Sequence, residues 1–138
     1  MWTFLKSLFF APAASPETVQ RLTTEIESIT TQSKIVVASK SHCPYCTRTK
    51  QTLASYGIQL EPLTDFETPV SPQGKSILLE LNQLSDGSLI QDILQRISGQ
   101  RTVPNIYING KHIGGNSDLQ ALHTSGQLEL LLKSAGLI

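Results

Sequence analysis

The sequence has few cysteines, no excess of either charge and no long apolar run, and each absence limits what the protein can be. Its 138 residues include only 2 cysteines. They lie three residues apart, which does not suit the disulfide framework of a small secreted domain. The 11 basic side chains are balanced by 11 acidic ones, so the basic surplus of a nucleic-acid-binding protein is missing. We therefore expect no nucleic acid among the partners.

The histidines do not complete a metal site with the cysteine pair. His42 directly precedes Cys43, too close in sequence to act easily as a further ligand, and His112 and His123 show no ligand spacing relative to each other. A structural zinc site needs a second pair of ligands, which the sequence does not offer. We expect no metal.

The N-terminal segment, residues 1–14, is apolar but is interrupted by Lys6 and is too short to span a bilayer. Three interpretations stay open: an added or disordered N-terminus, a mitochondrial or secretory targeting segment, and a short helix on the domain or on a membrane surface. Residues 15–138 are expected to form a single domain. We expect a cytoplasmic monomer without a membrane span, with a mitochondrial or secretory compartment as the alternative if residues 1–14 direct targeting.

Apolar spacing and turn residues predict an α/β fold. Ser15-Pro16-Glu17 combines an N-cap serine, a first-position proline and a first-turn acid. Asn109-Gly110 between two apolar runs is the strongest short-range hairpin signal, and the proline- and acid-rich residues 58–74 predict a loop. The expected elements are a helix from Pro16 past Ile29, a strand over 35–38, a helix over 44–56, a strand over 77–81, a helix over 86–98, hairpin strands over 105–108 and 111–113, a helix from 116 and a helix over 127–135. This order gives a four-stranded mixed sheet with helices on both faces.

Cys43 and Cys46 lie at the start of the helix predicted over 44–56. Unpaired backbone N–H groups and the helix dipole make that end positive, which stabilises a thiolate. The pKa of Cys43 is therefore expected well below the free value of about 8.5, with Lys40 adding positive charge. Cys46, about one turn further on, could attack a mixed disulfide formed at Cys43. We interpret the pair as a nucleophile and its resolving thiol, rather than as two inert buried cysteines.

Three motifs in this order resemble those of one family. Cys43-Pro44-Tyr45-Cys46 is similar to the active-site motif of dithiol glutaredoxins, Thr102-Val103-Pro104 to their TVP segment, and residues 114–118 to their GG-x-SD segment. The resemblance covers about residues 16–137 except the loop over 58–74. It implies a thioredoxin-like fold and a thiol–disulfide oxidoreductase that uses glutathione as co-substrate.

The resemblance also implies where glutathione would bind. The Val103-Pro104 bond would be cis and would face the cysteines, leaving the Val103 main chain free to pair with the ligand. Residues 116–118 begin a helix, so the N–H groups of Ser117 and Asp118 would take one carboxylate, and the Asp118 side chain would accept from the ammonium group. The remaining expected contacts are Lys40, Gln91 and Arg101 at the glycine carboxylate, Tyr45 beside the thiol, and Thr102 within the TVP segment.

Two functions from different classes follow from this resemblance. The first is an enzyme that reduces protein–glutathione mixed disulfides and some protein disulfides, so its partners would be glutathionylated or disulfide-bonded proteins. The second is a binding module that holds a [2Fe–2S] cluster with one cysteine per chain and glutathione. Pro44 and Tyr45 would crowd such a cluster, and Cys46 would compete for Cys43, so the sequence favours the enzyme.

Overall fold

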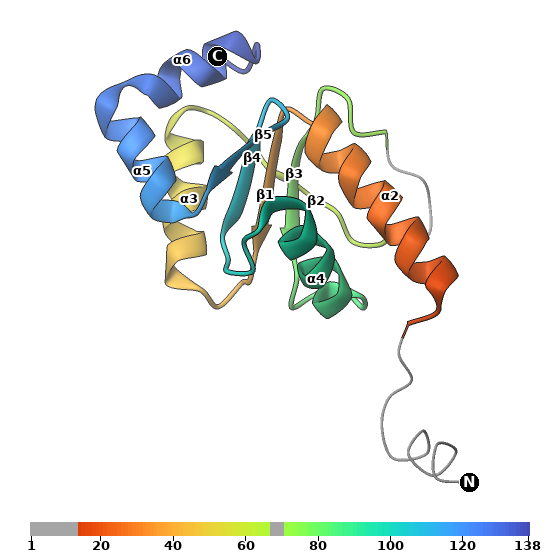
Figure 1. Cartoon of the computed structure of the whole chain (residues 1–138). Helices are drawn as coiled ribbons and strands as arrows, with labels where there is room; N and C mark the ends of the chain where they lie inside the picture. Colours follow the sequence, from red (N-terminus) through yellow and green to blue (C-terminus); the bar gives the residue numbers. More distant parts are fainter. Residues whose placement is uncertain (1–13, 67–70) are drawn as a thin grey trace, which may run out of the picture.

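The computed structural model describes residues 14–66 and 71–138, and Figure 1 shows a mixed sheet between two layers of helices. The sheet order is β2-β3-β1-β4-β5; β1 runs parallel to β3 and antiparallel to β4. The strands are β1 (Ile35–Ser39), β2 (Glu61–Pro62), β3 (Ser76–Glu80), β4 (Asn105–Ile108) and β5 (Lys111–Gly114). The helices are α2 (Pro16–Gln32), α3 (Pro44–Ser55), α4 (Gly87–Ser98), α5 (Asn116–Ser125) and α6 (Gln127–Ser134).

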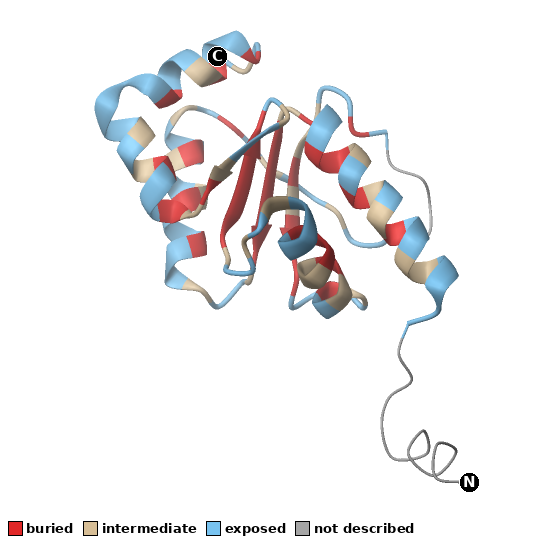
Figure 2. Ribbon diagram, in the orientation of Figure 1, coloured by how far each residue is buried: buried red, intermediate tan, exposed pale blue. Residues whose placement is uncertain are grey.

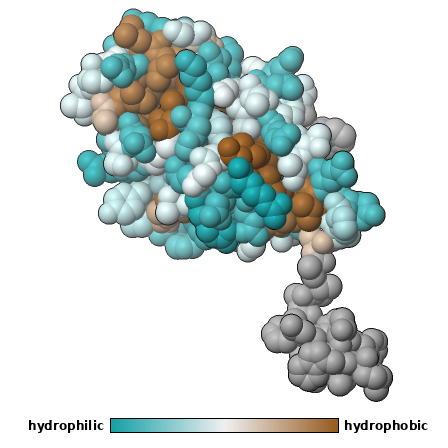
Figure 3. Space-filling model, in the orientation of Figure 1, coloured by the Kyte–Doolittle hydropathy of each residue, from teal (hydrophilic) through white to brown (hydrophobic). Residues whose placement is uncertain are grey.

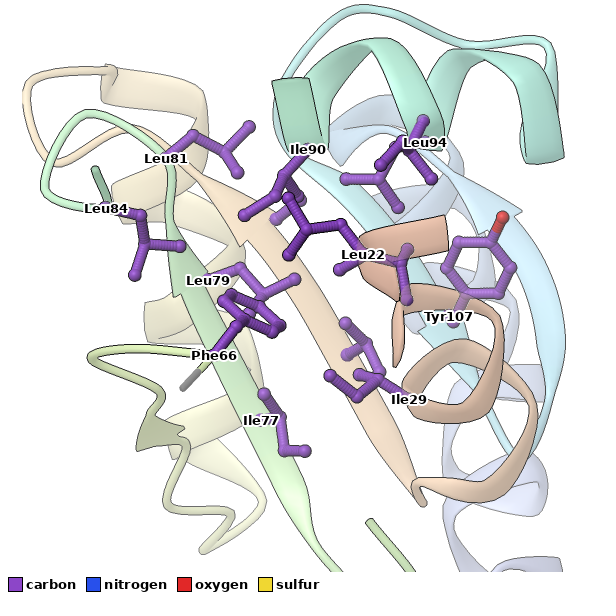
Figure 4. Packing of buried hydrophobic residues seen from close by; sticks show 14 residues of the cluster. Leu22, Ile29, Phe66, Ile77, Leu79, Leu81, Leu84, Ile90, Leu94 and Tyr107 are labelled. Carbon is purple, nitrogen blue, oxygen red and sulfur yellow. The ribbon is translucent and has the colours of Figure 1, made fainter. Parts of the chain in front are cut away.

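One face of the sheet is covered by α2 and α4. Val36 and Ala38 of β1 belong to the cluster on this face. Figure 4 shows Leu22 and Ile29 of α2 and Ile90 of α4 within the same cluster. The apolar stripe of α2 consists of Leu22, Ile26 and Ile29, spaced three and four apart and all fully buried. A continuous apolar layer of this kind fixes the two helices relative to the sheet.

The opposite face of the sheet is covered by α3, α5 and α6. Ile35 and Val37 alternate with Val36 and Ala38 along β1 and point to this side, where they pack with Leu53, Leu119 and Leu128. All five residues of β1 are buried (Figure 2), because a central strand covered on both faces has no solvent side. The exposed apolar side chains Leu130 and Ile138 belong to the C-terminal part, where Figure 3 shows a hydrophobic patch.

The predicted N-cap of α2, the predicted hairpin turn and the predicted end of α4 are confirmed, whereas the N-cap of α5 is Gly115 rather than one of residues 116–118. Ser15 caps α2 by accepting from the Thr18 N–H at 3.2 Å. Asn109 and Gly110 both have positive φ, as a two-residue hairpin turn requires. Gly99 ends α4 in the left-handed conformation.

The predicted strand count of four is wrong by one, although the α/β class is confirmed. Within the predicted loop over 58–74, Glu61–Pro62 form β2, which pairs in parallel with β3 at the edge of the sheet. Two exposed residues, one of them a proline, carry no alternation that a sequence pattern could detect, and proline is tolerated at a sheet edge. Residues 67–70 of that loop, and residues 1–13 of the proposed N-terminal extension, lie outside the described residues.

No helix in the described ranges is long and apolar enough to cross a membrane.

Candidate active site

Cys43 lies at the N-terminal end of α3, directly after the central strand β1. The chain leaves β1 at Ser39 and turns, with the Cys43 N–H donating to the Lys40 carbonyl at 3.0 Å. Cys43 is the N-cap of α3 and Pro44 occupies the first turn, where its missing N–H is not needed. Cys43 is half-buried, whereas Cys46 is fully buried in the first turn of α3. Only the first sulfur is therefore presented at the surface.

The surroundings shift the pKa values of the two thiols in opposite directions. Partial burial of Cys43 acts to raise its pKa, but the Cys46 N–H and thiol, the Tyr45 N–H and the charge of Lys50 outweigh this, so the pKa lies below its usual value. Burial raises the pKa of Cys46. At a given pH, a larger fraction of Cys43 than of Cys46 is therefore ionised to the thiolate, which is what the predicted role of Cys43 as nucleophile requires.

Lys50, which no sequence motif singled out, is a further positive charge that lowers the pKa of Cys43. Lys50 lies on α3 seven residues after Cys43, about two helical turns, and its Nζ is 3.4 Å from the Glu80 carboxylate at the end of β3. Lys40 is half-buried, and its predicted contribution of positive charge at Cys43 stays a prediction. The i, i+7 spacing from the nucleophile was the available signal for Lys50.

The turn that carries Cys43 is tied to the segment after β3. The Asn82 side chain accepts from the Ser41 N–H at 2.9 Å and donates to the Ser41 hydroxyl at 2.7 Å. The Leu81 N–H donates to the Ser39 carbonyl at 2.8 Å. The Ser41–Asn82 pair is 41 residues apart in sequence, so the sequence alone gives no signal for these bonds.

The TVP segment lies opposite the nucleophile. The Val103-Pro104 peptide bond is cis, and the Val103 carbonyl is 4.0 Å from Cys43 Sγ, close enough for a weak hydrogen bond from the thiol. A cavity of about 360 Å³ opens beside it, lined by Tyr45, Thr102, Val103, Pro104, Gly115, Asn116 and Ser117. The active-site helix, the TVP segment and the start of α5 thus meet at one depression.

The start of α5 forms the third side of this cavity. Gly115 is its N-cap, and the Gly115 N–H donates to Asp118 Oδ2 at 2.9 Å. The Asn116 side chain points inward instead, where its carbonyl oxygen accepts from the Thr49 hydroxyl of α3 at 3.0 Å. Asn116 therefore fastens α5 to α3, while Ser117 and Asp118 are exposed.

The structure brings together only some of the residues predicted to hold glutathione. Tyr45, Thr102, Val103, Pro104 and Ser117 line the cavity, but Lys40, Gln91, Arg101 and Asp118 do not. Gln91 donates to the Arg101 carbonyl at 2.8 Å. The Arg101 guanidinium pairs with Asp92 and contacts Gln95 Oε1 at 3.2 Å, so at present it is directed to α4.

The described residues contain no group of three or more histidine, cysteine or acidic side chains placed to hold a metal ion.

This arrangement defines a class of protein. A thiol pair at the start of the helix after the central strand, facing a cis X–Pro peptide across a mixed sheet covered on both faces, is the site of a thioredoxin-like thiol–disulfide oxidoreductase.

Comparison with known proteins narrows the class to a family. The Glutaredoxin family model matches residues 35–64 and 74–113. Glutaredoxin-1 of Saccharomyces cerevisiae is 44% identical over 119 residues, covering 86% of this chain and 94% of the yeast protein. Glutaredoxin-C2 of Arabidopsis thaliana is 39% identical over 112 residues, covering 81% of this chain and 86% of the Arabidopsis protein. The crystal structure of a buckwheat glutaredoxin–glutathione complex superposes with a TM-score of 0.73 at 32% identity, covering 91% of this chain and 99% of that one.

The chain belongs to the glutaredoxin family. It is a glutathione-dependent thiol–disulfide oxidoreductase, and the relatives do not favour the cluster-binding alternative.

Proposed function

We propose that the protein reduces protein–glutathione mixed disulfides, and some protein disulfides, with Cys43 as nucleophile, Cys46 as resolving thiol and glutathione as co-substrate. The position of Cys43 carries this proposal: its sulfur lies at the N-terminus of α3, 4.0 Å from the Val103 carbonyl beside the cavity. The lowered pKa of Cys43 supports it, because the thiolate is the attacking species.

The proposed reaction has two exchange steps. The Cys43 thiolate attacks the glutathione sulfur of the mixed disulfide, the S–S bond breaks, and the substrate protein leaves as a thiolate that takes up a proton. The thiolate of a second glutathione then attacks the glutathione sulfur bound to Cys43, releasing oxidised glutathione and restoring the Cys43 thiolate. The cycle therefore consumes one reduced glutathione, whose sulfur ends in oxidised glutathione bonded to the glutathione sulfur taken from the substrate. With a protein disulfide, Cys46 instead attacks the mixed disulfide at Cys43, which forms a Cys43–Cys46 disulfide and frees the substrate as a dithiol.

The proposed glutathione contacts follow the sides of the cavity. The Val103 main chain would pair with the cysteinyl unit of glutathione, beside Tyr45, Thr102 and Pro104. The N–H groups of Ser117 and Asp118, at the start of α5, would bind one carboxylate, and the Asp118 carboxylate would accept from the ammonium group. Lys40, Gln91 and Arg101 are proposed for the glycine carboxylate; for Arg101 this requires release from Asp92.

Single cysteine variants test this assignment on two substrates. Cys43→Ser is expected to abolish activity on both a glutathionylated peptide and a disulfide-bonded protein, because a neutral hydroxyl is a far weaker nucleophile than a thiolate. Cys46→Ser is expected to retain the first activity and lose the second, since glutathione can resolve the first intermediate. Activity of Cys43→Ser on the peptide, together with an inactive Cys46→Ser variant, would reverse the two roles.

The proposed setting is a monomer acting on glutathionylated or disulfide-bonded proteins in the cytoplasm, where reduced glutathione is abundant. Residues 1–14 are proposed as an extension of a single domain over 15–138. Fusing residues 1–14 to a fluorescent protein tests the compartment: import into mitochondria or the secretory pathway would replace the cytoplasmic assignment with a targeted one.

A further inference from the structure

The side chain of Gln100 contacts the TVP segment at two points. Its Nε2 donates to the Thr102 carbonyl at 3.1 Å and to the Pro104 carbonyl at 3.0 Å. These carbonyls lie on either side of Val103, whose own carbonyl is 4.0 Å from Cys43 Sγ. A glutamine amide nitrogen carries two protons, so each carbonyl can receive one of them. The amide therefore spans the residue that faces the nucleophile.

Gln100 is itself held by a polar network beneath the segment. Its N–H donates to the Ser98 hydroxyl at 3.1 Å, and its carbonyl accepts from Asn105 Nδ2 at 3.3 Å. Asn105 is buried, and its Oδ1 is 2.8 Å from His112 Nε2 on β5. Both the end of α4 and the β4–β5 pair thus fix the position from which the amide reaches the TVP segment.

The same amide lies close to the start of α5. A methyl group placed on Gly115 would be 3.9 Å from Gln100 Nε2 and 3.7 Å from the Pro104 carbonyl. Gly115 is the N-cap of the helix that carries Ser117 and Asp118. Gln100 is therefore at the junction of the two segments that line the cavity on the side opposite α3.

We propose that Gln100 is a positioning residue for glutathione recognition, which fixes the Thr102 and Pro104 carbonyls so that the Val103 main chain is pre-arranged for the ligand. This inference rests on the proposed function, in which Val103 pairs with glutathione. Residues 100–104 lie between α4 and β4 and belong to neither, so helix and sheet hydrogen bonds do not hold them. Without Gln100, the segment would have to be ordered at the moment of binding, which weakens binding.

The test compares Gln100→Met, which keeps a similar length but removes both donors, with Gln100→Glu, which places a carboxylate against the two carbonyls. We expect the apparent KM for a glutathionylated peptide to rise about 5- to 30-fold in Gln100→Met and further in Gln100→Glu, with a smaller change in kcat. The pH profile of Cys43 alkylation should not move, because Gln100 does not contact the thiol. Gln20→Met, the same substitution at an exposed site on α2, is the matched control and should behave as the wild type.

A second readout does not depend on turnover. In the reduced protein without glutathione, the Val103 amide should show increased motion by ¹⁵N relaxation in Gln100→Met but not in Gln20→Met. Ser98→Ala removes the acceptor of the Gln100 N–H and should also increase the motion of the Val103 amide. If Gln100→Met does not fold, Ser98→Ala takes its place in this measurement. Unchanged KM, or an unchanged Val103 signal in the folded variants, would overturn the positioning role. Wild-type protein without glutathione-dependent turnover would overturn the proposed function, while the relaxation result would still decide whether Gln100 orders the segment.

Discussion

At the scale of single residues, the reactivity of the site depends on how the two sulfurs are placed. Cys43 and Cys46 are the same chemical group three residues apart, yet the N-cap position lowers the pKa of the first and burial raises the pKa of the second. The thiolate fraction of Cys43 therefore rises at a lower pH than that of Cys46. Alkylation at a pH between the two values should label Cys43 selectively, and denaturing the chain should remove this selectivity.

Lys50 is predicted to contribute to that selectivity. Lys50→Gln removes the charge that favours the Cys43 thiolate, so the pKa of Cys43 should rise and its alkylation below that pKa should slow about two- to fivefold, the range of a partly exposed charge interaction. The measurement is the rate of iodoacetamide reaction against pH. Because Lys50→Gln also leaves Glu80 without its partner, Lys50→Gln/Glu80→Gln is the control for stability. An alkylation profile identical to that of the wild type would show that Lys50 does not act on the nucleophile.

Asp118 is predicted to have two separable roles. Asp118→Ala removes both the proposed acceptor for the glutathione ammonium and the cap of the Gly115 N–H. The ammonium contact is worth about 1.5–3 kcal/mol, so the apparent KM for glutathione should rise about 10- to 100-fold, with the pKa of Cys43 unchanged. Asp118→Asn keeps an oxygen for the Gly115 N–H and loses only the charge. Asp118→Asn should have the thermal stability of the wild type but keep the raised KM for glutathione of Asp118→Ala. If both its stability and its KM equalled those of the wild type, Asp118 would act only as a cap.

Not all of these residue roles could be predicted from the sequence. Cys43 and Cys46 were identifiable because their spacing and their place at a helix start are both local features. The contacts of Lys50 with Glu80 and of Ser41 with Asn82 are not, since they span 30 and 41 residues and depend on how β3 ends beside β1. The pairing of Arg101 with Asp92 was missed for a different reason: two exposed charges nine residues apart give no pattern that selects one partner.

At the scale of the elements, one glycine determines how α4 begins. Figure 1 shows α4 beginning after the turn that follows β3, and a methyl group on Gly87 would lie 1.8 Å from the Leu81 carbonyl oxygen. The oxygen belongs to the main chain, so the helix or the turn would have to shift. The sequence predicts a helix over 86–98, but this close approach is a tertiary contact that no local pattern specifies.

Gly87→Ala is therefore predicted to destabilise the fold. Overpacking against a fixed main-chain atom costs about 1–3 kcal/mol, which urea unfolding would detect as a lower midpoint with an unchanged slope. Activity should fall as well, because α4 carries Gln91 and, through it, the Arg101 carbonyl. Ser88→Ala at the next, exposed position is the control and should change stability by no more than about 0.5 kcal/mol. A Gly87→Ala midpoint equal to that of the control would contradict the packing argument.

At the scale of the whole molecule, the strands that alternate between two covered faces were predictable, whereas the edge strand was not. β1 reads as a continuous apolar run because both of its faces are buried. β2 is held by its pairing with β3 rather than by any pattern of its own. The active-site turn, the TVP segment and the start of α5 come from three distant parts of the sequence, and the sheet order places them at one cavity. Only the family resemblance predicted that these three segments lie together, because local sequence patterns predict helices and strands but not which of them are neighbours in space.

The boundary of the domain leads to the last prediction. Every residue assigned to the site lies at Lys40 or later, and α2 begins at Pro16 with Ser15 as its cap. A chain that starts at Ser15 keeps that cap and the full apolar stripe of α2. Removing residues 1–14 should therefore leave kcat/KM on a glutathionylated peptide within about tenfold of the full chain, equivalent to ~1.4 kcal/mol of barrier, and should leave the urea midpoint unchanged. A larger loss of activity at an unchanged midpoint would mean that residues 1–14 take part in catalysis or substrate binding, and the single domain would then have to include them.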